Sequence, residues 1–468
     1  MKKFLFSFAF AAFFLPGFSQ TITNKLTRAY HQFEKDAQLS NAIISLYVID
    51  GKTGRVVFDR NSKIGLAPAS TQKIITAATA YELLGQEFLY NTEFGYTGTI
   101  EGNNLNGSIY IKASGDPTLG SWRWKQTSEN EVMSRVVASF KKTGIAQYRN
   151  LVIDQEGWEG ESIPDGWIWQ DIGNYYGAGA EVLNWRENQY DLILQSGKNI
   201  GDKVMIKGTN PYLYHYDFNS YVISAAKGTG DRSYIYLPVN SKTGIVRGTI
   251  PIGQDKFLIS GAMPSPKFQL ASTLIDSLSK YDIRKQEESA GPITMTAEKP
   301  TLEKVTIIHR EQSPSLDSIV YWFLRKSINL YGEALVKTMA AKNREEATTV
   351  NGVNLLKDFW KGKGIAAGEL NMSDGSGLSP LNRVTTHAQV QVLKYAKDQP
   401  WFKSYFDAFP EYNKMKMKSG TISDVKSFCG YHRSSTGQEY IFSFIVNNYN
   451  GSSSTLVQKM YAVLDELK

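Results

Sequence analysis

The 468-residue sequence is poor in the residues that build metal centres and covalent cross-links. Its single cysteine, Cys429, excludes an internal disulfide, a cysteine-based zinc site and an iron–sulfur cluster. The five histidines show no metal-ligand spacing, and the motifs HExxH, GxxxxGK[ST] and GxSxG do not occur. Metalloprotease, P-loop NTPase and α/β-hydrolase chemistries are therefore disfavoured, and we expect neither a metal nor a cofactor.

Charge of one sign is not concentrated anywhere in the chain. The sequence has 52 Lys and Arg against 45 Asp and Glu, which gives a formal net charge of +7. Because the basic residues are scattered, an ordinary solvated surface is favoured over a nucleic-acid footprint, and affinity for an anionic polymer is the alternative. The 42% of hydrophobic residues fits a globular chain with room for two to four domains.

Hydrophobic runs long enough to cross a membrane are also missing, but the N-terminus has the pattern of a secretory signal peptide. Two lysines precede an apolar run over residues 4–15, which ends at Pro16. We expect residues 1–19 to be removed by cleavage after Ser19. The mature chain is then periplasmic or secreted, without stable insertion into a membrane.

The spacing of apolar residues predicts three blocks of secondary structure. A β-hairpin is expected over 42–60, followed by an apolar helix that begins near Pro68 and ends at Gly85. Helical periodicity returns with a first helix over about 316–324 and a second helix over about 333–342, and the chain then ends in three strands and a helix. The middle block is β-rich, with predicted strands at 107–112, 150–154, 190–195 and 233–239 and predicted helices at 130–142 and 270–281.

A serine three residues before a lysine on a helix can be activated for nucleophilic attack, because the two side chains share one face. The S-x-x-K pattern occurs at five serines: Ser70, Ser139, Ser224, Ser277 and Ser423. Ser70 and Lys73 stand out because they open the apolar helix, where backbone N–H groups stabilise a developing negative charge. Considered alone, a helix-capping role for Ser70 fits this pattern equally well.

Two further motifs follow in the sequence. Ser327-Ile328-Asn329 falls between two predicted helices and fits the pattern S-x-N. Lys418-Ser419-Gly420 lies on a predicted strand and is the only K-[TS]-G match that follows S-x-N. The three other matches, at 52–54, 142–144 and 242–244, precede it in the sequence. The order of the three motifs is typical of penicillin-recognising serine acyl-transferases.

With these motifs the chain resembles the D-alanyl-D-alanine carboxypeptidase/endopeptidase family, the low-molecular-mass class C penicillin-binding proteins. The segments that carry the resemblance, besides the motifs, are ASGDPTL (113–119), VIDQEGWEG (152–160), HREQSPSL (309–316), SINLYGEAL (327–335) and DGSGLS (374–379). The resemblance implies an α+β fold, a penicillin-binding/serine β-lactamase-like transpeptidase domain whose antiparallel sheet is flanked by helices. We expect residues 20–92 and 302–468 to form this catalytic domain, split by a β-rich insertion of two subdomains at 93–301.

The resemblance implies acyl transfer at a D-Ala-D-Ala peptide or an equivalent peptide cross-link. Ser70 attacks the carbonyl carbon, Lys73 accepts the serine proton, and Ser327 relays the proton to the leaving amine. An ordinary lysine is protonated at neutral pH, so the site has to lower the pKa of Lys73. Partial burial and the second cation, Lys418, both act in that direction.

The resemblance also implies a set of substrate-binding residues. Asn329 holds the peptide amide, and Lys418 with Ser419 meets the terminal carboxylate through charge-assisted contacts. After Gly420, the backbone N–H of Thr421 completes the oxyanion hole together with that of the nucleophilic serine. Ile328 and Ser419 replace the commoner polar residue and threonine of the family, which bears on substrate preference rather than on catalysis.

Several other residues have a structural interpretation beside the functional one. Asp154 matches a family position near the pocket for the stem-peptide side chain, although an Asp at a strand end is more often structural. The turn at 374–377 is expected near the site without direct chemistry. The aromatic segment 158–176 is expected in the core of the insertion rather than as a sugar-stacking platform, and Cys429 as a small buried residue.

The expected ligands are peptidoglycan stem peptides, with β-lactam antibiotics as covalent inhibitors and no nucleic acid; a homodimer is left open. One alternative is a β-lactamase or esterase on the same scaffold, which rapid turnover of penicillin would reveal. The other is a non-catalytic peptidoglycan-binding protein, against which the retention of all three motifs argues. The sequence does not distinguish carboxypeptidase from endopeptidase preference.

Overall fold

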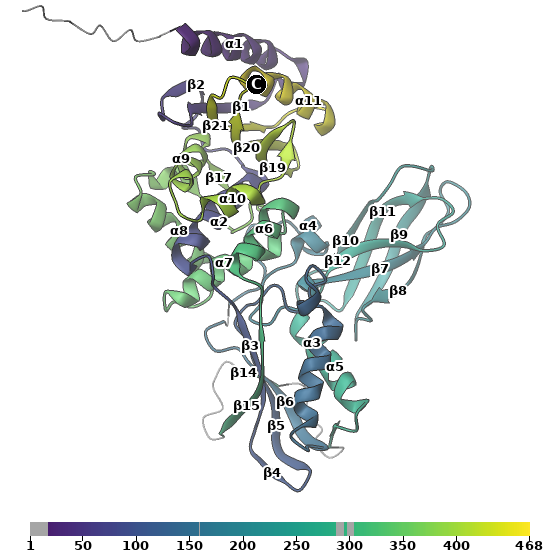
Figure 1. Ribbon diagram of the computed structural model, residues 1–468. Helices are drawn as coiled ribbons and strands as arrows, with labels where there is room; N and C mark the ends of the chain where they lie inside the picture. Colours follow the sequence, from purple (N-terminus) through teal and green to yellow (C-terminus); the bar gives the residue numbers. More distant parts are fainter. Residues whose placement is uncertain (1–16, 159, 287–293, 297–303) are drawn as a thin grey trace, which may run out of the picture.

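The structure is a computed structural model that describes residues 17–158, 160–286, 294–296 and 304–468 (Figure 1). Most of the predicted signal peptide, residues 1–19, lies outside the described residues, and α1 (Gly17–Glu34) begins within it. In the described ranges, no helix is long and apolar enough to cross a membrane.

The first sheet is antiparallel and joins the two ends of the described chain. Its order is β18-β19-β20-β21-β1-β2, so the N-terminal hairpin pairs with the last strand along the whole of β1. Its strands are β18 (Glu411–Tyr412), β19 (Met415–Ile422), β20 (Val425–Arg433), β21 (Glu439–Asn447), β1 (Ile43–Asp50) and β2 (Val56–Arg60). The predicted hairpin and the three predicted C-terminal strands are confirmed.

Helices cover both faces of this sheet, which explains why β1 is apolar at nearly every position. Leu46 and Val48 pack with α1 and α11 (Ser453–Leu464), whereas Tyr47 and Ile49 face the larger helical layer. The helices of that layer are α2 (Lys73–Leu84), α6 (Leu316–Lys326), α7 (Asn329–Lys342), α8 (Thr349–Gly362), α9 (Thr386–Lys397) and α10 (Phe402–Ala408). A sheet between two helical layers is the predicted α+β architecture.

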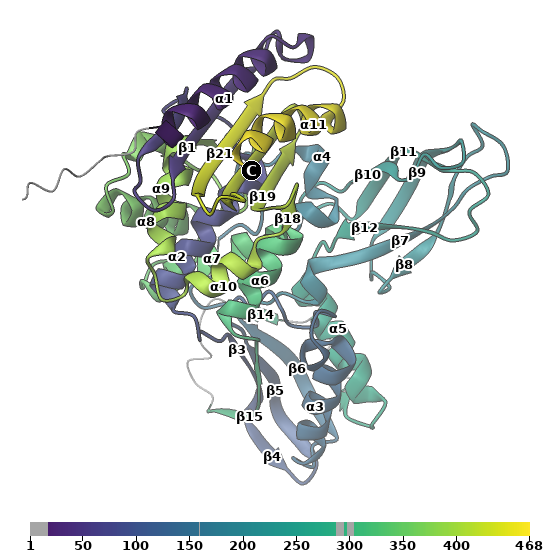
Figure 2. The same cartoon turned by 45° about the horizontal axis from the view of Figure 1, so that its top comes forward.

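A second sheet lies away from the first and carries two helices on one face (Figure 2). Its order is β13-β6-β5-β3-β15, with β14 paired to β6 and β4 to β5. The elements are β3 (Asn91–Thr97), β4 (Thr99–Glu101), β5 (Asn104–Lys112), β6 (Gln147–Asp154), β13 (Arg284–Lys285), β14 (Thr294–Thr296), β15 (Val305–Gln312), α3 (Glu129–Lys141) and α5 (Pro266–Ser279). Since β3 and β15 pair, this sheet reaches beyond 93–301 on both sides.

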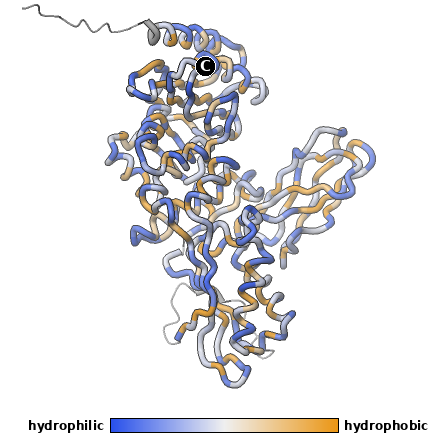
Figure 3. The backbone as a smooth tube through the Cα atoms, viewed as in Figure 1, coloured by the Kyte–Doolittle hydropathy of each residue, from blue (hydrophilic) through white to orange (hydrophobic). Residues whose placement is uncertain are grey.

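The third unit is a small sandwich of two three-stranded sheets, β12-β7-β8 and β10-β11-β9. Its strands are β7 (Gln189–Gln195), β8 (Met205–Asn210), β9 (Asp217–Ala225), β10 (Arg232–Tyr236), β11 (Thr243–Pro251) and β12 (Phe257–Ala262). Hydrophobic residues recur along these strands, as along the strands of the other sheets (Figure 3). The strand predicted at 233–239 ends early, at Tyr236, because Pro238 has no N–H for a ladder hydrogen bond.

Candidate active site

Ser70 and Lys73 lie where the N-terminal hairpin leads into the buried helix α2. The sequence predicts one continuous helix, but the structure has a 3-10 turn, η2 (Ala69–Gln72), and the α-helix begins at Lys73. The Nζ of Lys73 is 3.0 Å from the Oγ of Ser70, so the predicted nucleophile and base are in hydrogen-bond contact. Both belong to a segment that the surrounding helices bury, and Lys73 itself is fully buried.

The buried amine of Lys73 has two further acceptors. Its Nζ lies 2.6 Å from Oδ1 of Asn329 and 2.7 Å from the carbonyl oxygen of Ser376. Burial lowers the pKa of Lys73 well below its ordinary value, and the Lys418 cation lowers it further. An amine in this state can hold its lone pair near neutrality, which a proton acceptor requires.

The S-x-N motif forms the junction between α6 and α7. Ser327 closes α6 in the left-handed conformation, with φ of 59°, and Ile328 is extended, so that α7 begins at Asn329. This helix starts earlier than the predicted 333–342 because the left-handed residue, not a glycine or proline, separates the two helices. The amide of Asn329 accepts from Lys73 and donates through Nδ2 to the carbonyl oxygen of Tyr176 at 2.7 Å.

The K-S-G motif lies on β19 and faces the S-x-N junction. The Nζ of Lys418 donates to the Oγ of Ser327 at 3.0 Å and to the carbonyl oxygen of Ser419 at 2.8 Å. Burial lowers the pKa of Lys418 to about 7. This lysine therefore gains or loses its charge near neutral pH.

Gly420 allows β19 to pass directly against the turn that holds Ser70, the predicted nucleophile. A Cβ at this position would lie 2.9 Å from the backbone N of Ser70 and 2.7 Å from the carbonyl oxygen of Pro68. The next residue, Thr421, follows on the same strand, and its Oγ1 accepts from the Nζ of Lys426 at 2.7 Å. The backbone of β19 thus runs beside the Ser70 N–H, where the predicted oxyanion hole is expected.

The structure does not bring Asp154 into this group. Asp154 is buried at the end of β6, where the hydroxyl of Tyr110 and the backbone N–H of Glu156 donate to its carboxylate. Among the described residues, no hydrogen bond or ion pair joins Asp154 to the three motifs. Its role in binding a stem-peptide side chain stays a prediction.

The turn at 374–377 contacts the site more directly than the sequence predicts. The carboxylate of Asp374 accepts hydrogen bonds from several donors: Gln72 Nε2, Trp167 Nε1, Asn382 Nδ2 and the backbone N–H groups of Gly377 and Ser379. This fixed turn directs the Ser376 carbonyl at Lys73. The expectation of a turn near the site is confirmed, and the turn also contacts Lys73, the predicted base, through its backbone.

Glu333 is a second residue that motif analysis misses. It lies one turn after Asn329 on α7, is fully buried, and its Oε2 accepts from the backbone N–H of Gly375 at 3.0 Å. Burial, together with the nearby Asp374 carboxylate, raises the pKa of Glu333 to about 8. Its spacing of four residues from Asn329 places both on one helix face, and this spacing is the sequence signal for it.

The aromatic segment 158–176 does not belong only to the core of the insertion, as the sequence suggests. Trp167 donates to Asp374, and the Tyr176 carbonyl accepts from Asn329, so the segment packs against the catalytic helices. Trp169 and Tyr175 are half exposed, at 49% and 50%. The segment makes these contacts because it connects the second sheet to the sandwich and packs against α7 on the way.

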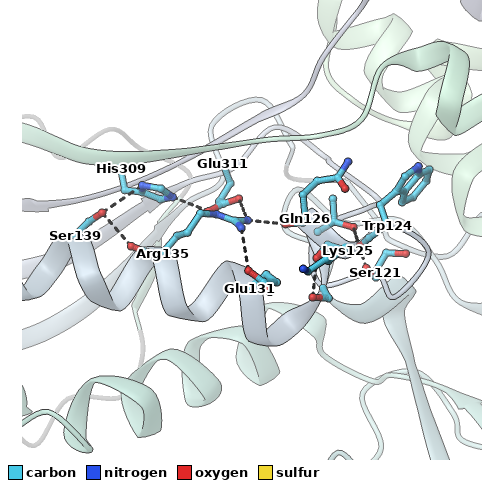
Figure 4. A network of polar contacts seen from close by, with 11 residues as sticks. Ser121, Trp124, Lys125, Gln126, Glu131, Arg135, Ser139, His309 and Glu311 are labelled. Carbon is cyan, nitrogen blue, oxygen red and sulfur yellow. Dashed lines mark hydrogen bonds and ion pairs between the residues drawn. The ribbon is translucent and has the colours of Figure 1, made fainter.

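A second serine, Ser139, lies in an arrangement that resembles a catalytic triad (Figure 4). Its Oγ is 3.3 Å from Nδ1 of His309, whose Nε2 is 2.6 Å from Oε1 of Glu311. However, the Ser139 hydroxyl donates to the Arg135 carbonyl at 3.0 Å, and the Arg135 guanidinium binds both oxygens of Glu311. The network joins α3 to β15, and we interpret it as structural.

Cys429 is buried on β20 with its Sγ near the Thr71 carbonyl, so the prediction of a small buried residue is confirmed. Burial raises the pKa of its thiol, which keeps the thiol protonated. In the part of the chain that the structure describes, no three His, Cys, Asp or Glu side chains are grouped so as to hold a metal ion.

The chain is similar in sequence to known D-alanyl-D-alanine carboxypeptidases. The model of the D-Ala-D-Ala carboxypeptidase 3 (S13) family matches residues 26–467. The D-alanyl-D-alanine carboxypeptidase of Actinomadura sp. strain R39 is 23% identical over 458 residues, covering 92% of this chain and 82% of the relative. The D-alanyl-D-alanine carboxypeptidase DacB of Haemophilus influenzae is 22% identical over 416 residues, covering 85% of this chain and 83% of the relative.

The fold has a counterpart among solved structures. The crystal structure of penicillin binding protein 4 (dacB) from Haemophilus influenzae superposes with a TM-score of 0.77 at 20% identity, covering 96% of this chain and 98% of that one. This likeness confirms the predicted fold class. Because the family model spans nearly the whole described chain, the protein belongs to the D-Ala-D-Ala carboxypeptidase 3 (S13) family, serine peptidases that cleave D-Ala-D-Ala peptides.

Proposed function

We propose that Ser70 of this peptidase forms an acyl-enzyme with the stem peptides of peptidoglycan and releases their C-terminal D-Ala. The observation that carries the proposal is the 3.0 Å contact between the Ser70 hydroxyl and the buried amine of Lys73. Neutral Lys73 takes the hydroxyl proton while Oγ bonds to the carbonyl carbon. The resulting oxyanion accepts from the N–H groups of Ser70 and Thr421, one of which is typically worth about 3 kcal/mol in the transition state.

Ser327 of the S-x-N motif and Lys418 of the K-S-G motif assist the departure of the leaving amine. Ser327, whose Oγ accepts from Lys418, relays the proton that Lys73 has taken: its hydroxyl gives a proton to the amine nitrogen as the carbon–nitrogen bond breaks and regains one from the Lys73 ammonium, which leaves Lys73 neutral again. Water then hydrolyses the ester of Ser70, with Lys73 again accepting a proton. Asn329 orients the substrate amide, and Lys418 with Ser419 binds the terminal carboxylate.

The proposal also covers acylation by β-lactams and the cellular compartment in which the protein acts. Penicillin binding protein 4 of Haemophilus influenzae, which covers 94% of this chain at 20% identity, was solved in complex with a β-lactam. We propose that this chain is likewise acylated by β-lactams and, after removal of residues 1–19, acts in the periplasm. We also propose that the segments predicted at 20–92 and 302–468 fold as the catalytic domain around the insertion predicted at 93–301, except that β3 begins at Asn91 and β15 (Val305–Gln312) pairs with it in the sheet of the insertion.

The test uses Ser70→Ala with Ser139→Ala as the matched control. We expect a fluorescent penicillin to label the unmodified protein and S139A, with one adduct detected by mass spectrometry, and not to label S70A. Labelling of S70A would refute the assignment of the nucleophile.

Incubation with purified sacculi then defines the reaction. We expect release of free D-Ala, and the loss of cross-linked muropeptides would add endopeptidase activity. Rapid turnover of penicillin without any D-Ala release would instead favour a β-lactamase, and neither activity would favour a binding protein.

A further inference from the structure

The outer face of the sheet β10-β11-β9 carries aromatic side chains in register. Tyr221 of β9 lies opposite Arg247 of β11, which lies opposite Tyr234 of β10. The neighbouring residues in the three strands point inward and are buried in the sandwich core: Val222, Val246 and Ile235. Since side chains alternate along strands, the row Tyr221–Arg247–Tyr234 points outward.

The side chains of this row are exposed to solvent and are not covered by other parts of the described chain. Tyr221 is 65% exposed, Tyr234 is 39% exposed, and Ile223 in the next row is 46% exposed. Scattered apolar residues are normal on protein surfaces, but a contiguous group on one flat sheet face is typical of a binding surface.

The aromatic face continues toward the catalytic site. Tyr236, at the end of β10, packs on Trp169 of α4 (Trp169–Ile172), with ring centroids 4.9 Å apart. A few residues further, the carbonyl of Tyr176 accepts from Asn329 in the active site. Figures 1 and 2 both place α4 between this sheet and β19, the strand of Lys418.

We infer that this face, which we define by Trp169, Tyr221, Tyr234, Tyr236 and Arg247, binds the glycan strand of peptidoglycan. The inference rests on the proposed peptidoglycan substrate, because a stem peptide held at Ser70 remains attached to its glycan. That polymer therefore leaves the active site along a neighbouring surface, and the aromatic face adjoins the site.

The chemistry of the face suits a saccharide chain. The electron-rich faces of aromatic rings attract the polarised C–H groups of pyranose rings, and tyrosine adds a hydroxyl for hydrogen bonding. Tyr221 and Tyr234 are separated by two strand spacings, about 10 Å, which is close to the length of a disaccharide unit. Between them, the Arg247 guanidinium can donate to sugar hydroxyls or to carboxylates of the attached peptides.

The sandwich over residues 189–262 carries the aromatic face, and we call it the lobe. The net charge of this lobe agrees with an anionic polymer as the occupant. Residues 189–262 contain eight Lys and Arg, five Asp and no Glu. Stem peptides carry carboxylates, so the polymer is attracted to this lobe over a longer range than stacking provides.

The test compares Y221A/Y234A with Tyr212→Ala, a control tyrosine that is 67% exposed on a loop beside α5. Binding is measured by co-sedimentation with purified sacculi, with S70A added to each variant so that nothing is cleaved. We expect the double variant to bind about tenfold more weakly, since the loss of two stacking contacts corresponds to about 1.4 kcal/mol. The Tyr212 variant is expected to bind normally.

Two further measurements keep this inference separate from the proposed function. With Ser70 present, we expect Y221A/Y234A to keep its rate of penicillin acylation and of D-Ala release from a soluble pentapeptide, while release from sacculi falls. Glycan strands freed of peptide by an amidase are expected to compete for sacculus binding. Unchanged sacculus binding in the double variant, an equal loss in the Tyr212 control, or no competition by peptide-free glycan would overturn the inference.

Discussion

Two buried amines of unlike function distinguish this site at the residue scale. Lys73 contacts Ser70 and has a pKa well below its usual range, whereas Lys418 contacts Ser327 and has a pKa of about 7. In the proposed mechanism, the first amine acts without its proton and the second binds a carboxylate with its proton. Near neutral pH, the low pKa of Lys73 and the intermediate pKa of Lys418 allow both conditions at once.

The pKa of Lys418 predicts an alkaline limb in the pH profile. Because the pKa is lowered, Lys418 is charged below about pH 7 and loses its proton above it, so kcat/KM for peptides with a free C-terminal carboxylate should fall above about pH 7. An otherwise identical peptide with an amidated C-terminus cannot make the ionic contact and should lack this limb. The same limb with both peptides would show that another group titrates.

Substitutions of Glu333 are expected to affect acylation indirectly, because Glu333 acts through the turn that directs the Ser376 carbonyl at Lys73. Glu333→Ala leaves the buried N–H of Gly375 without an acceptor, which costs about 1–3 kcal/mol, and should slow penicillin acylation about tenfold or more. Glu333→Gln keeps an acceptor oxygen and should restore acylation at pH 7. Thr338→Val, a buried change on the same helix, serves as the stability control.

The pH dependence of the glutamine variant distinguishes positioning from general stability. Since the pKa of Glu333 is about 8, a negative charge develops near Lys73 as the pH rises through that value and favours its protonated form. The unmodified protein should therefore lose acylation rate above about pH 8 relative to E333Q. If E333A, E333Q and the Thr338 variant all lose acylation in parallel with thermal stability, Glu333 has no positioning role.

The residues that could be predicted from the sequence are those whose side-chain chemistry is specific. Ser70, Lys73 and Lys418 belong to spaced motifs, because the reaction needs a hydroxyl and amines at set positions. The carbonyl groups of Ser376 and Tyr176 leave no such signal, since every residue has a backbone carbonyl. Their positions depend on a turn and a crossing segment that only the folded chain brings together.

At the element scale, the site depends on how closely β19 approaches η2. The backbones are so near that Gly420 has no room for a side chain on the Ser70 side. The sequence predicts the strand and the helix, although not the 3-10 turn η2 before it, and periodicity alone does not show that β19 and η2 touch. It also does not reveal the left-handed residue Ser327, which fixes where α6 ends and α7 begins.

This contact predicts a large effect from a single methyl group. In Gly420→Ala, the added Cβ meets Pro68, Ser70 and Ser427 at less than 3.0 Å, so β19 has to shift away from Ser70. We expect penicillin acylation to fall about a hundredfold, the size of effect seen when an oxyanion-hole donor is lost. Gly362→Ala, at the end of α8 with no atom within 4 Å of the new Cβ, should leave the rate unchanged.

The measurement is the second-order rate of acylation by a fluorescent penicillin, together with circular dichroism to show that the variants remain folded. A folded G420A variant with the rate of the unmodified protein would contradict the close approach of β19 to η2.

At the scale of the whole molecule, a buried carboxylate connects the middle block of the chain to the catalytic helices. Glu187 is fully buried and binds the Arg123 guanidinium at 2.7 and 2.9 Å, the Ser121 hydroxyl at 2.7 Å, and the Tyr331 hydroxyl of α7 at 2.8 Å. Tyr331 lies two residues after Asn329. The sequence offers no signal for this cluster, because its members are far apart in the chain and each is common on surfaces.

We therefore predict that Glu187 stabilises the docking of the middle block and, through α7, the active site. Glu187→Gln leaves the Arg123 charge without its partner, and breaking a buried ion pair typically costs about 3–5 kcal/mol. The urea midpoint should fall markedly, and unfolding followed by two probes should separate into two transitions if docking is lost first. Lys403→Ala removes an exposed partner of Asp407 and should leave the midpoint unchanged. Equal midpoints for E187Q and the unmodified protein would show that the units are held together by their apolar contacts alone.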